Sequence, residues 1–134
     1  MQPQPLNLLA AISLIALVTV MFGGYSLLRL LNAGDRLSPF QLSQFRVGHA
    51  HAGVLLLLSL IFVAYLDRTD YANPVRVLLF AIAFAGGLAQ SGGFFLHMMV
   101  GKPGEASAGT TLTATGAVLL AVSVIALAVG LLIA

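Results

Sequence analysis

The chain has 134 residues, of which 60% are hydrophobic and only 7% are charged, and its mean hydropathy is +1.04. Because roughly 25% of the residues of an average soluble domain are charged, this composition excludes an ordinary soluble globular protein and a disordered chain. The net charge of +2 is too small for a nucleic-acid-binding surface. The absence of cysteine excludes disulfides, thiolate metal sites and cysteine nucleophiles. The composition therefore predicts an integral membrane protein whose surroundings are the lipid bilayer.

Four apolar segments are each long enough to cross the hydrocarbon core, which requires about 20 residues. We expect these spans at residues 6–31, 45–66, 74–100 and 110–134. The first is interpreted as a retained span, because it lacks the basic start and the small-residue cleavage site of a signal peptide. Backbone groups in lipid must bond within their own segment. The whole chain, 1–134, is therefore predicted to be one all-α membrane domain, a bundle of four transmembrane helices.

The basic residues of the connections predict an orientation. Four of the six belong to the side of the membrane that holds the first and third connections: Arg29, Arg36, Arg46 and Lys102. Cytoplasmic loops carry an excess of lysine and arginine. We therefore expect this side to face the cytoplasm, with the chain in the inner (cytoplasmic) membrane of a bacterium.

Three histidines, His49, His51 and His97, are expected near that same side of the membrane. An ionisable residue at membrane depth is costly and usually faces the interior of a bundle, so three histidines in one layer indicate a binding site. Residues two apart on a helix point in nearly opposite directions, so His49 and His51 should face different neighbours. His51 lies about one turn inside the expected span and is the better metal ligand. The alternative for each histidine is a hydrogen bond to a loop carbonyl.

The third segment carries a stripe of small and polar residues on one helix face, namely Gly86, Gln90, Gly93 and His97. Small residues in membrane helices allow close helix–helix contact, which is the structural interpretation of the stripe. In the functional interpretation, the stripe leaves a groove for a flat ligand that faces His51, and Gln90 contacts that ligand. Gly53 gives the second segment a similar flat surface.

A histidine beside flat, small-residue surfaces favours axial ligation of haem iron over a zinc site, because zinc requires three or four ligands in a closed shell. His51 is then the metal ligand, and His97, Gly53 and Gly93 are further candidates for binding the cofactor. Arg46 could pair with a haem propionate, although contact with lipid headgroups is the more ordinary role of such a cation. The acidic residues all lie in connections or at helix ends, which disfavours a proton pump or a cation-coupled transporter.

The motif Ala50-His51-Ala52-Gly53 at the start of the second of four spans resembles the styrene-oxide isomerase and hydroxylaminobenzene mutase family. A second similarity is the stretch from Ala89 to Phe95 in the third span. The resemblance implies a homotrimer of four-helix protomers with haem b near the subunit boundaries. It also implies that His51 is the axial ligand. In this family the ferric haem acts as a Lewis acid on the oxygen of a small apolar epoxide, and the isomerisation involves no net redox change.

The chain departs from the family pattern at three polar positions. Leu57 stands in place of an asparagine, Phe94 in place of a tyrosine, and Gln90 in place of an asparagine that is one methylene shorter. These changes favour retention of haem binding over retention of isomerase activity. If His97 reaches the iron from the second side, a non-catalytic electron-transfer or sensor protein is the alternative. A structural membrane protein, or one whose histidines bind copper, is the third hypothesis.

Overall fold

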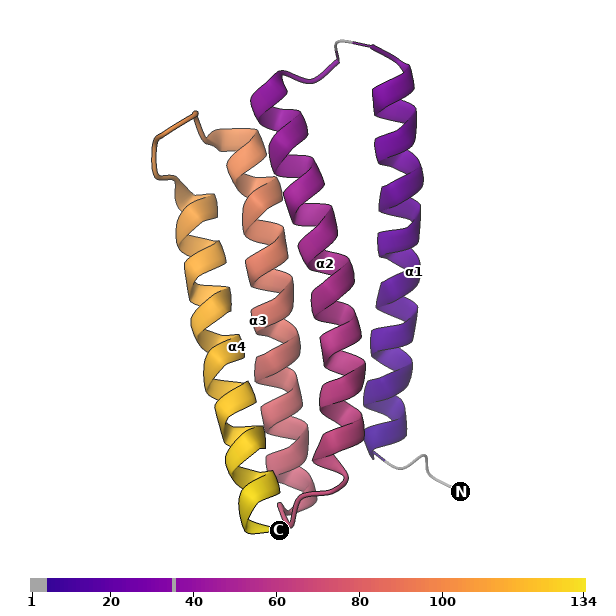
Figure 1. The fold of residues 1–134 in the computed structure, drawn as a ribbon, viewed down its shortest axis with the longest axis vertical. Helices are drawn as coiled ribbons and strands as arrows, with labels where there is room; N and C mark the ends of the chain where they lie inside the picture. Colours follow the sequence, from indigo (N-terminus) through magenta and orange to yellow (C-terminus); the bar gives the residue numbers. More distant parts are fainter. Residues whose placement is uncertain (1–4, 35) are drawn as a thin grey trace.

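The computed structural model of the chain describes residues 5–34 and 36–134 and consists of four long helices (Figure 1). These are α1 (Pro5–Asn32), α2 (Pro39–Leu66), α3 (Asn73–Val100) and α4 (Ala108–Ile133), and the described residues contain no strand. Each helix is long and apolar enough to cross a membrane. The predicted all-α class with four transmembrane helices is confirmed, and the chain is an integral membrane protein in contact with lipid.

Local capping residues set where two of the helices begin. Helix α2 begins at Pro39, six residues before the expected start of the span. Its first turn is closed by Ser38, whose Oγ accepts the N–H of Gln41 at 3.2 Å while the Gln41 side chain accepts the N–H of Ser38 at 3.0 Å. Ser107 and Thr110 form the same reciprocal cap at the start of α4. Such pairs satisfy backbone donors that have no partner within the helix.

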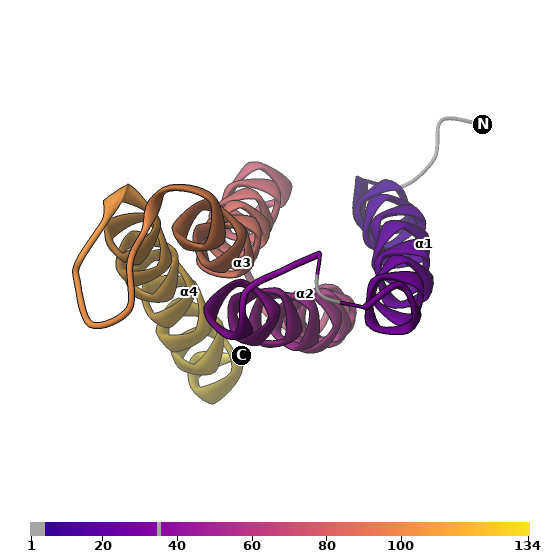
Figure 2. The same cartoon turned by 90° about the horizontal axis from the view of Figure 1, so that it is seen from above.

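The helices lie side by side in chain order, as a curved row and not as a closed ring (Figure 2). Contacts are most extensive between α3 and α4, then between α2 and α3, and α1 packs mainly on α2. Within the described residues, α1 and α4 do not touch. Along the helix axes, the start of α1 and the end of α4 lie at one end of the bundle, and the α1–α2 and α3–α4 connections lie at the other (Figure 1).

The contact between α3 and α4 is made by glycines that bring the two backbones together. A Cβ atom on Gly116 would lie 2.3 Å from the backbone nitrogen of Gln90, and one on Gly86 would lie 2.9 Å from the carbonyl oxygen of Gly116. Two helical turns away, Gly93 and Gly109 are related in the same way. In each helix the two glycines are seven residues apart, so they recur on one face. No side chain larger than hydrogen can occupy these four positions without separating the helices.

The apolar core lies toward the end of the bundle that holds the start of α1 and the end of α4. Its most deeply buried members come from α2, α3 and α4: Phe62, Val63, Leu66, Phe80, Ala83, Leu120 and Leu127. Tyr71, in the connection between α2 and α3, donates a hydrogen bond of 2.8 Å to the carbonyl oxygen of Ala126, and its ring packs on Gly130. This end of the structure is therefore held by both packing and polar contacts.

Replacing Gly93 by alanine tests the close contact between α3 and α4. The new Cβ would lie 2.1 Å from Thr113 Oγ1 and 2.5 Å from the carbonyl oxygen of Gly109, so we expect a loss of about 2 kcal/mol in the free energy of unfolding, as for other overpacked sites. Gly92→Ala is the matched control, because nothing lies within 4 Å of a Cβ at that position. Unfolding of both variants in mixed micelles would measure the difference, and equal stabilities would contradict the assigned contact.

Candidate functional site

His51 has one ring nitrogen bonded to its own helix and the other available. Its Nδ1 lies 3.0 Å from the carbonyl oxygen of Val47, one turn earlier on α2. A carbonyl oxygen only accepts, so the Nδ1–H must donate this bond. In a neutral ring the Nε2 atom is then unprotonated, with a lone pair free for a ligand. Metal-binding histidines are commonly oriented in this way, by a hydrogen bond from the nitrogen that does not ligate.

The ring of His51 lies between helix α3 and an open apolar depression on the surface of α2. Its centroid is 4.9 Å from that of Phe94, and the two planes are tilted by 42°. The depression is lined by Ala50, His51, Val54 and Leu55. Val54 is 65% exposed. This side of His51 therefore opens toward the surroundings of the chain and not toward a closed cavity.

Arg46 lies on the same exposed face of α2 as the depression. It is exposed, and it precedes Ala50 by one helical turn, so the two side chains are neighbours on that face. The face continues toward the other end of the helix through Leu57 and Ile61, which are 50% and 53% exposed. Arg46 thus places a cation on this otherwise apolar exposed face of α2, at the end nearer the α1–α2 connection.

His49 faces α1, as the helical period predicts. Cβ atoms on Gly23 and Gly24 would each lie 3.3 Å from a ring nitrogen of His49, so the imidazole packs against the small-residue surface of α1. His49 and His51 consequently belong to different helix contacts. The expectation that they face different neighbours is confirmed.

His97 belongs to the connection between α3 and α4. It lies in the last turn of α3 and is 9% exposed. Its Nδ1 is 2.7 Å from Ser107 Oγ, which also accepts the N–H of Gly109 at the start of α4. The ring meets that of Phe40 edge to face, with centroids 5.2 Å apart. This histidine therefore joins the ends of α2, α3 and α4.

The contacts of His51 and His97 differ, and α2 begins earlier than the apolar pattern predicts. His51 lies twelve residues after Pro39 and near the middle of the 28-residue helix. Its ring packs on Phe94 of α3, whereas the ring of His97 packs on Phe40 and its Nδ1 is bonded to Ser107 Oγ. His97 is thus already engaged at the α3–α4 connection. Among the described residues, no group of three His, Asp or Glu side chains could hold a metal ion.

The two glycines expected to form a flat surface face other helices. Gly53 lies toward α1, where a Cβ would be 3.7 Å from Val20 Cγ1. Gly93 lies against α4, so a leucine there would separate helices and would not fill a groove facing His51. The stripe of small residues on α3 thus has the structural role that close helix contact predicts.

Gln90 lies between the two contact faces of α3. It is half-buried, and its backbone carbonyl oxygen accepts a hydrogen bond of 3.3 Å from Thr113 of α4. It precedes Phe94, the neighbour of His51, by one turn, so the two side chains share a helix face. Of the residues expected at the site, His51 and Arg46 lie on α2, and Gln90 lies on α3 one turn before Phe94, the neighbour of His51.

Two signals in the sequence could have located the α4 residues that contact the small-residue stripe of α3 and His97. Small residues recur in α4 at intervals of seven: Gly109, Gly116, Ser123 and Gly130, all of them buried. This period marks the face of α4 that meets the glycines of α3. The pattern Ser107-x-x-Thr110 predicts a helix cap, which locates the hydroxyl that bonds His97.

Comparisons of the chain with protein-family models, with curated proteins and with solved structures found no match. The functional argument therefore depends on the geometry around His51 and on the motifs in the sequence.

Replacing Ser107 by alanine tests the contact at the end of α3. The change removes both the cap of α4 and the partner of His97 Nδ1, and loss of a serine cap costs about 1 kcal/mol. We expect Ser107→Ala to lower the free energy of unfolding by about 1–2 kcal/mol. Thr115→Ala is the control, since its hydroxyl is exposed and bonds only to Thr111 of its own helix. The interpretation of Ser107 is wrong if the two variants unfold alike.

Proposed function

We propose that this chain is a haem-b-binding membrane protein in which His51 Nε2 ligates the iron, and that it acts as an isomerase or mutase on a small apolar epoxide or hydroxylamine. The observation that carries the proposal is the hydrogen bond from His51 Nδ1 to the carbonyl oxygen of Val47 at 3.0 Å, which leaves Nε2 as the free ligand atom. The resemblance in Ala50-His51-Ala52-Gly53 supplies the cofactor and the class of reaction.

The residues around His51 are compatible with a flat, apolar group. The depression beside its ring is lined by alkyl side chains, and Ala50 is small enough to leave access to the ring. Arg46, at the connection end of the same face, would pair with a propionate near the membrane surface. The depression is open on one side, so a second protomer has to cover the group. A homotrimer, as the resemblance implies, would provide that cover.

The protein's own contribution to the reaction would be to orient the ligand and exclude water. When bound, ferric haem supplies a Lewis acid for the substrate oxygen. The Val47 carbonyl fixes the plane and tautomer of the His51 ring, and the Phe94 ring restricts its rotation from the α3 side. The Gln90 amide is proposed to bind the polar atom of the substrate. The lipid-facing position of the site would favour uncharged, apolar substrates.

The contacts of His97 favour this proposal over electron transfer. Its Nδ1 is bonded to Ser107 Oγ and its ring packs on Phe40, so it already has a role at the α3–α4 connection. His51 would then be the single histidine that holds the haem. We place the protein in the inner membrane of a bacterium, with the α1–α2 and α3–α4 connections in the cytoplasm, on the distribution of its arginines.

A structural role is the alternative, and one observation favours it. His49 packs against the glycines of α1 and His97 bonds the cap of α4, so both already have roles in helix packing. If His51 serves only to pack against Phe94, the chain binds no cofactor. The same experiment distinguishes the two functions.

The absorption spectrum of the detergent-purified protein, expressed with ample haem, is the direct test. We expect a Soret band in the parent and its loss in His51→Ala, because that variant lacks the only proposed ligand. His49→Ala is the matched control: it removes an imidazole two residues away that faces α1, and it should retain the band. A parent protein without a Soret band would rule out haem binding, and retention of the band in His51→Ala would rule out His51 as the ligand.

Activity is tested separately with an aryl epoxide, whose isomerisation to an aldehyde changes no redox state. We expect Gln90→Leu to reduce turnover at least roughly tenfold without loss of the Soret band, since removing one oriented hydrogen-bond donor commonly has an effect of about this size or more. Gln44→Leu, which makes the same change on α2 two helical turns before His51, should have little effect. A haem-loaded parent that converts no epoxide or hydroxylamine would limit the function to haem binding.

A further inference from the structure

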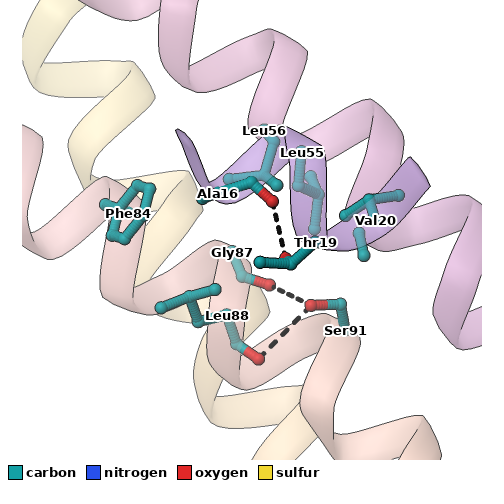
Figure 3. A pocket seen from close by; sticks show the side chains of 10 residues that line it. Ala16, Thr19, Val20, Leu55, Leu56, Phe84, Gly87, Leu88 and Ser91 are labelled. Carbon is teal, nitrogen blue, oxygen red and sulfur yellow. Dashed lines mark hydrogen bonds between the residues drawn. The ribbon is translucent and has the colours of Figure 1, made fainter. Parts of the chain in front are cut away.

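A cavity of about 110 Å³ lies between α1, α2 and α3 (Figure 3). Small residues from each helix leave the space, namely Ala16, Ala52 and Gly87, and larger apolar side chains enclose it, among them Leu55, Leu88 and Phe84. The depression at His51 is a separate feature on another side of α2, and the two share only Leu55 among their lining residues.

The cavity lies near the middle of each of the three helices, and therefore near the centre of the membrane. Ala16–Val20, Ala52–Leu56 and Gly87–Ser91 each include or adjoin the midpoint of a 28-residue helix. A molecule can reach this depth only by crossing apolar surroundings. Charged and strongly polar ligands are therefore excluded by the cost of leaving water.

The two hydroxyl groups at the cavity do not make it polar. Thr19 donates to the carbonyl oxygen of Ala16 at 2.6 Å, and Ser91 donates to that of Gly87 at 2.8 Å, as the dashed lines in Figure 3 indicate. Both hydroxyl protons are thus used within their own helices. The remaining wall is hydrocarbon, which makes an ordered water a poor occupant because a buried water needs several polar partners.

We infer that this cavity is a binding site for one small uncharged hydrocarbon molecule, of the size of a single aromatic ring. An apolar protein cavity of about 150 Å³ is known to bind benzene, and the present cavity is of the same order. It lies beside α1, the helix with the fewest buried residues, and its lining residues Thr19 and Leu88 are exposed, so a small molecule can enter from the surrounding lipid. The inference goes beyond the proposed function, and it stands whether or not haem binds at His51.

Benzene is the probe, and the protein is the full chain in lipid nanodiscs with labelled leucine and valine methyl groups. We expect the methyl signals of Val20, Leu55 and Leu88 to shift with a saturable dependence on benzene concentration. The signal of Val18, which is 62% exposed on α1, should shift only in proportion to the benzene dissolved in the lipid. The contrast separates a bound molecule from general partitioning into the bilayer.

Ala16→Leu fills the cavity from α1, and we expect it to weaken the saturable response at least tenfold. Ala11→Leu is the matched control, because it makes the same change at an exposed position of α1 and should leave the response intact. Proportional shifts at all methyl groups of the parent would overturn the inference, as expected if a lipid chain end fills the space. A saturable response unchanged in Ala16→Leu would also overturn it.

Discussion

The backbone contact between α3 and α4 is the constraint on which the rest of the arrangement depends. Lipid is as apolar as leucine, so helices in a membrane gain little from burying alkyl groups against each other and associate instead through close packing and polar contacts. The paired glycines Gly93–Gly109 and Gly86–Gly116 give the closest packing in the chain. They also fix which face of α3 remains for α2, and this face carries Phe94, the neighbour of His51.

Packing becomes looser along the row from α4 to α1. Glycine meets backbone at the α3–α4 contact. At the α2–α3 contact, Gly48 meets the ring of Phe95 and the Cβ atom of Phe94, and at the α1–α2 contact a glycine pair meets the His49 ring. Only Leu9 and Ser13 are buried in α1. The apolar cavity occurs at this loose side, while the tight side is occupied by contacts that leave no space. Binding in this chain is therefore expected where helices can separate at low cost.

Hydropathy predicted the four spans because length and apolarity are what crossing a membrane requires, but it could not predict their ends. The start of α2 depends on the local bonds between Ser38 and Gln41, which hydropathy does not detect. The earlier start places His51 near the middle of α2. The helical period correctly separated His49 from His51. It could not tell whether Gly93 faces α2 or α4, because a period defines a face and not the partner of that face.

The position of His51 near the middle of α2 raises the question of what its ring contacts. A half-buried imidazole near the middle of a membrane helix carries two polar nitrogens, and the carbonyl of Val47 satisfies only Nδ1. Acyl chains cannot donate to Nε2, and a polar atom that has no partner in the hydrocarbon region of a membrane costs free energy. A bond from Nε2 to an iron atom, or to a donor on a second protomer, would offset that cost. The exposed apolar face of α2 beside Val54 offers space for an iron-bearing cofactor or for a second protomer. An arrangement with both on that face would satisfy Nε2 and cover the exposed apolar surface.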